Sequence, residues 1–193
     1  MGFDHTLPAA QTGNLLLLMV DITRLNVQGI AIKMTTLLSF IAGLVVSRCA
    51  YHYYRSIYWR IYILVGLSAA CLFTFLAFDH LPSGLAIAPL SFTLAMTTGA
   101  FNKVENELYN NSFTTGNIKK AIIAWCEFLF KGQAEQKERA VIFTCLVLSF
   151  VIGAFTAALF YFLFGMAALL VILCEIIIFT VCYFLLIRFS QKS

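Results

Sequence analysis

The feature that most constrains this chain is a pair of long apolar runs towards its C-terminal end. Residues 140–163 carry no charged side chain, and residues 166–187 carry only Glu175. A helix needs about 20 apolar residues to cross the hydrocarbon core of a bilayer, so each run is long enough to span it. A break at Phe164 and Gly165 separates the runs, and we expect them to form a tight helical hairpin.

The composition of the whole chain points to the same environment. Hydrophobic residues make up 61% of the sequence and charged residues only 11%, against about 25% charged residues in an ordinary soluble domain. A soluble chain of this size needs far more polar surface to cover one core. We therefore expect an all-α, polytopic membrane helical bundle that forms a single integral membrane domain over residues 1–193.

Apolar stretches with few charges predict five spans, at residues 27–51, 61–78, 89–104, 140–163 and 166–187. The first span includes Lys33 and Arg48 as flanking residues, because their long side chains can extend to the interface. Lys and Arg gather after the first span, before the fourth and after the fifth. Because such residues favour the cytoplasmic side, we expect these segments and the C-terminus inside and the N-terminus outside, in the inner cell membrane. Arg24 and Lys33 would then lie on the outer side, against this rule.

Two matches in the same order indicate an internal repeat. The tripeptide Thr-Gly-Asn occurs at Thr12, Gly13 and Asn14 and again at Thr115, Gly116 and Asn117. Downstream, residues 38–43 (Leu-Ser-Phe-Ile-Ala-Gly) recur as residues 148–153 (Leu-Ser-Phe-Val-Ile-Gly). The repeats cover about residues 12–80 and 85–189. With the orientation above they are inverted, as in many secondary transporters.

Each Thr-Gly-Asn is expected to be a turn that opens a short helix of about 12 to 15 residues, too short to cross the bilayer. Such helices are either re-entrant or interfacial. A helix N-terminus attracts anions, and a bound anion would offset Lys119 and Lys120 in the first turn of the second helix. The alternative is that the tripeptides merely cap helices and that the lysines follow the inside rule.

Two polar residues within the spans complete the predicted substrate-binding site. Glu175 lies near the middle of the last span, where an ionised carboxylate is costly and marks a proton relay or a substrate contact. Asn102, at the end of the third span, is a candidate partner. A neutral Glu175 that is hydrogen-bonded between helices is the alternative.

Other chemistries find no support in the sequence. The six cysteines show no metal-ligand spacing, and there is no P-loop, dinucleotide fingerprint or nucleophile elbow. The formal net charge is only +4 and the positive residues are spread along the chain, unlike a nucleic-acid binder. We expect no enzyme activity, no metal, no cofactor and no nucleic-acid partner.

The Thr-Gly-Asn turns, Gly99 and Asn102 on a span, and the closing pair of spans together resemble the YoaK-like bacterial membrane proteins, a family of unknown function. The resemblance covers about residues 12–186. The family's Gly-x-Gln-Asn-Ala pattern departs here at Phe101 and Lys103. The resemblance also implies an opening span before the first turn, which would be missing from this chain.

These observations predict a small secondary transporter or permease for a small, anionic solute, with its site between the two short helices and near Asn102 and Glu175. The alternative is a structural, lipid-binding or assembly protein whose helices associate through Ser39, Gly43, Ser149 and Gly153. The partners expected are the lipid bilayer, the anionic solute, and a second copy or a partner helix in place of the missing span.

Overall fold

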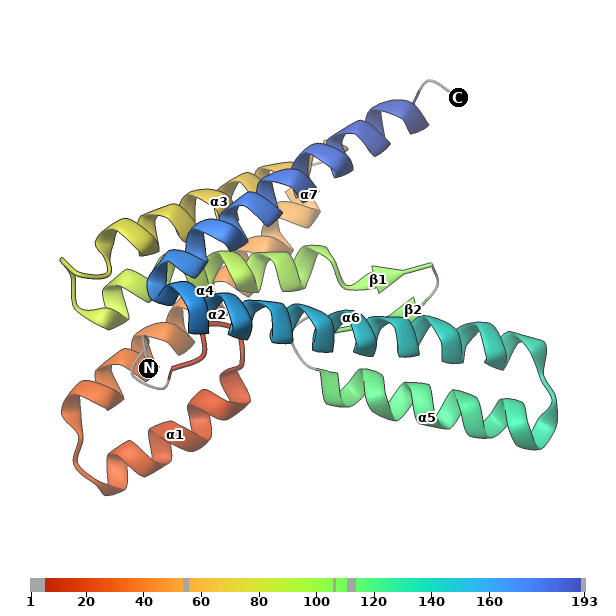
Figure 1. The fold of residues 1–193 in the computed structure, drawn as a ribbon, viewed down its shortest axis with the longest axis horizontal. Helices are drawn as coiled ribbons and strands as arrows, with labels where there is room; N and C mark the ends of the chain where they lie inside the picture. The colour runs from red at the N-terminus through yellow and green to blue at the C-terminus, as the bar shows by residue number, and fades with distance from the viewer. Residues whose placement is uncertain (1–5, 54–55, 106, 111–113, 192–193) are drawn as a thin grey trace. The chain divides into compact units, whose positions relative to one another are not determined.

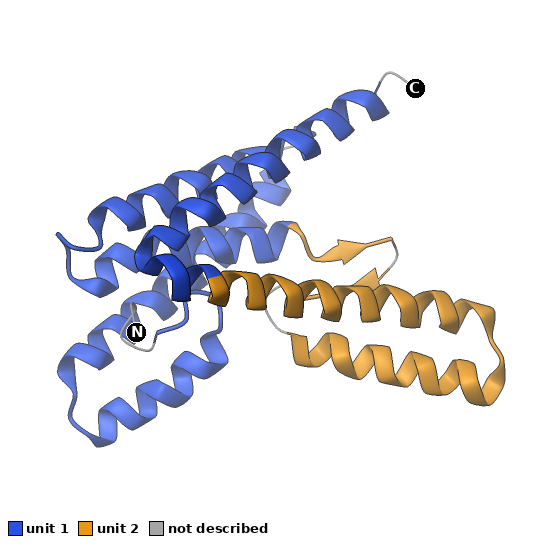
Figure 2. Ribbon diagram, viewed as in Figure 1, with its two compact units in different colours: residues 1–100, 160–193 blue, residues 101–159 orange. Residues whose placement is uncertain are grey.

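The computed structural model describes residues 6–53, 56–105, 107–110 and 114–191 and is almost entirely helical (Figure 1). The chain divides into two compact units, residues 1–100 with 160–193 and residues 101–159 (Figure 2). The described part of the first unit contains the α-helices α1 (Gln11–Thr23), α2 (Val27–Tyr53), α3 (Trp59–Ala77), α4 (Ser83–Ala100) and α7 (Ala168–Ser190). The second contains β1 (Lys103–Val104), β2 (Glu107–Leu108), α5 (Thr114–Lys131) and most of α6 (Ala134–Phe164).

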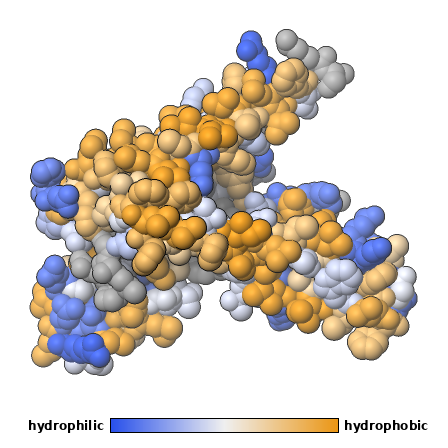
Figure 3. Space-filling model, viewed as in Figure 1, coloured by the Kyte–Doolittle hydropathy of each residue, from blue (hydrophilic) through white to orange (hydrophobic). Residues whose placement is uncertain are grey.

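Among the described residues, four helical segments are long and apolar enough to cross a membrane: α2, α3, α4 and the continuous stretch Ala134–Ser190. That last stretch holds α6 and α7, which are separated by a 3-10 turn (Gly165–Ala167) in which Gly165 adopts a left-handed φ of 57°. Each of the two helices is long enough to span on its own. Apolar residues cover most of the visible surface (Figure 3). The expectation of an all-α membrane protein is therefore confirmed.

Small residues bring α2 and α4 unusually close together. A Cβ atom added at Gly43 would lie 2.2 Å from the carbonyl oxygen of Phe92 and 2.8 Å from the Cβ of Ala95. One turn further along α2, the Ser47 hydroxyl donates to the Met96 carbonyl oxygen over 3.1 Å. Close backbone approach and hydroxyl-to-carbonyl bonds are the means by which membrane helices associate. The predicted contact through Gly43 is thus made within the chain, against α4.

The third span differs from its predicted bounds. The helix begins at Ser83, directly after Pro82, and contains Pro89 in its interior. The proline lacks the N–H that would bond a carbonyl oxygen of the preceding turn, and in that turn the Thr74 hydroxyl of α3 donates to the Ala86 carbonyl oxygen over 3.0 Å. The helix ends at Ala100 and not at residue 104, since β1 and β2 form an antiparallel hairpin beyond it.

The second unit is a helical hairpin. At 18 residues α5 is longer than expected, and it ends where Gly132 takes a φ of 67°. The Trp125 indole donates to the Thr144 hydroxyl over 3.0 Å, and the Lys120 ammonium lies 4.9 Å from the centre of the buried Phe143 ring. Residues Ile118, Ile122 and Leu129 of α5 are exposed. This apolar surface suits an interfacial or re-entrant helix.

Candidate functional site

The two Thr-Gly-Asn motifs have the same local structure. Asn14 accepts a hydrogen bond from the Leu7 backbone N–H over 2.9 Å and donates one to the Leu7 carbonyl oxygen over 2.6 Å. Asn117 forms the same pair of bonds with the backbone of Asn110, at 3.4 and 2.8 Å. In both cases the partner lies seven residues upstream. The internal repeat therefore extends to a shared structural device, which we call the asparagine clasp.

The clasps change the interpretation of the motifs. Each tripeptide occupies the second to fourth positions of its helix, α1 or α5, and not a turn in front of it. The prediction that each tripeptide forms a turn is wrong, since its residues are helical and neither Gly13 nor Gly116 has a positive φ. Side chains at this position point back towards the helix N-terminus, so the asparagine amide reaches the preceding segment of chain. Asn14 and Asn117 are buried, whereas Thr12 and Thr115 are exposed.

The other predicted site residues lie on exposed surfaces. Glu175 is exposed on α7, and Asn102 is exposed between α4 and β1, where its carbonyl oxygen accepts the Tyr109 N–H. Gly13 and Glu175 belong to the first unit, while Gly116 and Asn102 belong to the second. A common site formed by all of these residues stays a prediction.

Lys120 has partners that the sequence did not indicate. Its ammonium donates to the Leu108 carbonyl oxygen and lies over the Phe143 ring. Lys119 is exposed. A neutral carbonyl and an aromatic face therefore offset the positive charge of Lys120 near the start of α5, and the expected anion is not required for that purpose.

A buried polar network ties the start of α1 to α2 and α4. The Ser91 hydroxyl, fully buried on α4, lies 2.7 Å from the Pro8 carbonyl oxygen and 3.0 Å from that of Thr36 on α2. Gln11 donates to the Pro8 carbonyl oxygen over 2.9 Å and accepts from Asn14 over 3.1 Å. These bonds anchor the N-terminal end of α1 against α2 and α4.

At the C-terminal end of α1, Asp21 on α1 and Lys33 on α2 form a buried ion pair. The Lys33 Nζ lies 2.5 Å from the Asp21 Oδ2, and the side chains are only 5% and 13% exposed, respectively. The second carboxylate oxygen, Oδ1, accepts a hydrogen bond from the Asn26 amide over 3.0 Å. Ionisable residues in so apolar a protein are costly unless paired, and they commonly mark functional sites.

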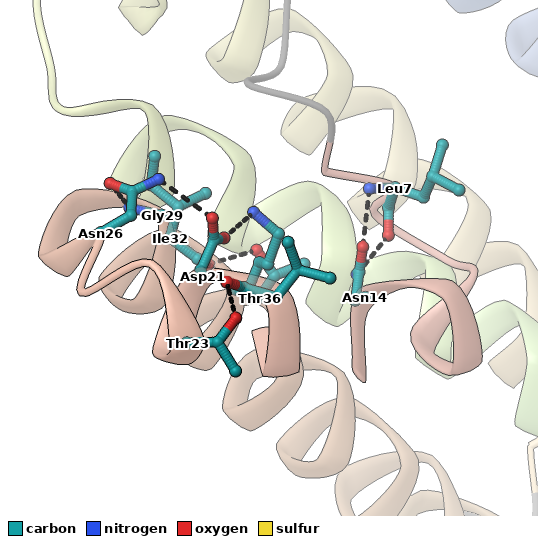
Figure 4. Close-up of polar contacts among 10 residues, drawn as sticks. Leu7, Asn14, Asp21, Thr23, Asn26, Gly29, Ile32 and Thr36 are labelled. Carbon is teal, nitrogen blue, oxygen red and sulfur yellow. Dashed lines mark hydrogen bonds and ion pairs between the residues drawn. The ribbon is translucent and has the colours of Figure 1, made fainter. Parts of the chain in front are cut away.

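The turn between α1 and α2 holds this pair in place (Figure 4). Leu25 adopts a left-handed φ of 53°, and the Asn26 N–H then bonds back to the Asp21 carbonyl oxygen over 2.9 Å. The Asn26 side chain in turn accepts from the Gly29 N–H over 3.1 Å. A Cβ at Gly29 would lie 2.5 Å from the Asp21 Oδ2, so glycine leaves room for the carboxylate against α2.

A cavity of about 360 Å³ opens beside the pair. Its volume falls within the range of small-molecule sites. Hydrophilic residues gather on this corner of the molecule, where α1 turns into α2 (Figure 3, lower left). The lining combines two cations, one carboxylate and two side-chain amides with apolar residues: Leu17, Val20, Asp21, Arg24, Asn26, Gln28, Gly29, Ile32 and Lys33.

The charges around Asp21 favour its ionised form. The bond to the Lys33 ammonium lowers the pKa of the Asp21 carboxyl below its ordinary value of 3.8, although burial opposes this shift. The Asn26 amide and the charge of Arg24 lower the pKa further. The lining thus combines the Asp21 carboxylate with two basic residues, Arg24 and Lys33, and its formal net positive charge attracts small anions.

The sequence contained a signal for this pair. Lys33 lies well inside the first span, and Arg24 and Lys33 were the two residues that conflicted with the predicted orientation. We interpreted Lys33 as a flanking residue whose side chain extends to the interface. A lysine within an apolar helix, with an aspartate on the preceding short helix, is better read as half of a buried ion pair.

Comparison with known proteins identifies one family. The family model described as "Protein of unknown function (DUF1275)" matches residues 1–182. No curated protein and no solved structure matches the chain.

Proposed function

Because the chain belongs to the DUF1275 family, whose function is unknown, we propose a function from the chemistry of the chain itself: a small secondary transporter or permease for a small, anionic solute. The observation that carries this proposal is the buried Asp21–Lys33 ion pair beside a cavity of about 360 Å³. Such charges are expensive in an apolar protein and are kept where solutes or ions are handled. The proposed role is non-enzymatic.

The internal repeat supports a functional reading of the pair. Asn14 and Asn117 differ by 103 positions, so Asp21 corresponds to Ala124; Phe40 and Phe150 differ by 110, so Lys33 corresponds to Phe143. Ala124 and Phe143 are both buried. Packing at these positions therefore does not require charge, and the ion pair is an addition to the first half of the protein.

The proposal includes a location and an orientation. The protein would lie in the inner cell membrane with its C-terminus in the cytoplasm, as the Lys and Arg residues in the loops favour. Arg24 and Lys33 still lie on the side that this rule disfavours, although Lys33 is paired with Asp21. A second copy of the chain or a partner helix would complete the transport path beside the bilayer lipids.

Glu175, on α7 of the same unit as the Asp21–Lys33 cavity, is the candidate for a second contact along the path of the solute. An exposed carboxylate in the middle of a span would give such a path a second titratable group.

Uptake by purified protein in liposomes tests the function. Wild-type proteoliposomes are expected to take up at least one member of a panel of small labelled carboxylates faster than protein-free liposomes, with saturation. Glu175→Gln is assayed in parallel. Equal uptake by this variant would remove Glu175 from the path but leave the Asp21–Lys33 site. Absence of uptake across the panel would contradict the transporter proposal.

A non-transporting assembly protein is the second candidate. The observation that favours it is the exposed stripe of small residues on α6: Ser149 is exposed, and a Cβ at Gly153 would meet no atom within 4 Å. Such a stripe suits close contact with a helix of another chain. Under this proposal, Gly153→Leu would disrupt oligomers in cross-linking experiments, whereas it would leave the Asp21–Lys33 cavity unchanged.

A further inference from the structure

We infer that the cavity beside α1 binds a small, singly charged oxoanion through Lys33, and that the anion displaces the carboxylate of Asp21, which then takes up a proton. This inference rests on the proposed function for its biological meaning and deepens it by naming the solute class and the coupling ion. It concerns a binding equilibrium that can be measured without transport.

The donors that face the cavity define the ligand. Lys33 lies at its wall and Arg24 is an exposed residue of the same lining. Asn26 and Gln28 add side-chain amides that can donate to an oxygen atom. Two cations and two amides match the two oxygens of a carboxylate, while the apolar part of the lining, Leu17, Val20 and Ile32, suits a short carbon chain.

Because the Lys33 ammonium is buried, a bound anion and the Asp21 carboxylate must compete for it. The Lys33 side chain is 5% exposed and its ammonium contacts the Asp21 Oδ2 at 2.5 Å. An anion that approaches this ammonium must share or replace that contact. Two carboxylates beside one ammonium in an apolar wall repel each other, and such a pair is stabilised when one of them is protonated.

The exchange balances in charge and atoms. The ion-pair contact between the Lys33 Nζ and the Asp21 Oδ2 breaks, and the Nζ forms a new contact with the ligand oxygen. One proton from the aqueous phase adds to the Asp21 carboxylate, whose Oδ1 keeps the hydrogen bond from Asn26. The charged groups acting on Asp21 are Lys33 on α2 and Arg24 on α1. The adjoining helix α4 carries no titratable residue. Anion and proton therefore bind together.

Isothermal titration of the purified protein tests this inference, with acetate and benzoate as free ligands and phosphatidylglycerol in nanodiscs as the lipid source of an oxoanion. Repeating the titration in buffers of different ionisation enthalpy gives the protons taken up. We expect about one proton per anion, and affinity that strengthens by about tenfold for each unit of pH decrease. Tight binding of the lipid alone, with the same proton uptake, would assign the cavity to a headgroup.

Two variants make the result decisive. Asp21→Asn should bind the anion without proton uptake and with affinity that does not change with pH. The double variant Asp21→Asn with Lys33→Met should not bind it, and its circular dichroism checks folding. Binding without proton uptake by the wild type, binding by the double variant, or no binding of any probe would overturn the inference. If the protein takes up solute but anion binding is not linked to a proton, the transport proposal stands and this inference fails. If anion binding is linked to a proton but no solute is taken up, this inference stands and the transport proposal fails.

Discussion

Lys33 on α2 contacts Asp21 on α1 at 2.5 Å, in a chain of which only 11% is charged, and the contact closes the turn between a short helix and a membrane span. The pair is buried on the protein side and flanked by a cavity on the other. A pair needed only to join the helices could be replaced by apolar residues, often at no cost in stability. Its position beside a cavity therefore favours a functional role.

The contact of α2 with α4 gives a stability prediction. Gly43→Ala places a Cβ 2.2 Å from the Phe92 carbonyl oxygen, so the helices must move apart, at a cost of about 1–3 kcal/mol. Gly66→Ala on α3 is the matched control, because a Cβ there meets no atom within 4 Å. Thermal unfolding in detergent should show a lower Tm for the first variant only. Equal Tm values would contradict the close packing.

The asparagine clasps predict parallel effects in the two halves. Asn14→Ala leaves the Leu7 N–H and carbonyl oxygen without their partner, and Asn117→Ala does the same at Asn110. Each change should cost about 1–3 kcal/mol. Amide hydrogen exchange should accelerate locally, around Leu7 in one variant and around Asn110 in the other. Thr12→Ala, at an exposed position, is the control, and unchanged exchange in both asparagine variants would disprove the clasps.

The turn after α1 predicts a stabilising substitution. Leu25 has a φ of 53°, which costs a residue with a side chain about 1 kcal/mol relative to glycine. Leu25→Gly should therefore raise the Tm, since the Leu25 side chain is 82% exposed and its loss removes little packing. The reverse change at a similar turn, Gly132→Ala at a φ of 67°, should lower it. Destabilisation by Leu25→Gly would argue against the left-handed turn.

Asp21 predicts an acid dependence of stability. Lys33 lowers the pKa of this carboxyl below 3.8 in the folded protein, so between the two pKa values the unfolded chain binds more protons. The stabilisation is thus complete above about pH 4 and is lost as the pH falls from 3.8 through the folded pKa. Tm measured from pH 7 to pH 3 should decline less steeply for Asp21→Asn than for the wild type, and identical slopes would contradict the ion pair.

Much of the fold could be predicted because bilayer thickness sets the length of each span. The bounds of α2 and α3 agree with the apolar runs to within two residues. The third span, predicted at residues 89–104, was misplaced: its helix begins at Ser83 and ends at Ala100, and Glu105, with a φ of 51°, turns the chain into a hairpin. A left-handed turn made by a residue other than glycine or asparagine cannot be recognised from the sequence.

The candidate site could be predicted less well than the fold, again because it depends on a turn formed by ordinary residues. The Asp21–Lys33 pair depends on a left-handed turn at Leu25, a position where Gly or Asn would be the usual signal. The motif asparagines were recognised by their repetition, but their bonds to a segment seven residues upstream depend on the path of the preceding loop. The ion pair and the asparagine hydrogen bonds both depend on the three-dimensional course of the backbone, which the residue types alone do not reveal.

Uptake by a charge-neutral variant tests the central claim most directly. The double variant Asp21→Asn with Lys33→Met removes both charges together, so no unpaired charge is left buried and the fold should persist with a Tm near that of the wild type. We predict that its proteoliposomes take up small carboxylates no faster than protein-free liposomes while wild-type proteoliposomes do. Wild-type uptake by this variant would contradict the assignment of the Asp21–Lys33 cavity as the solute site.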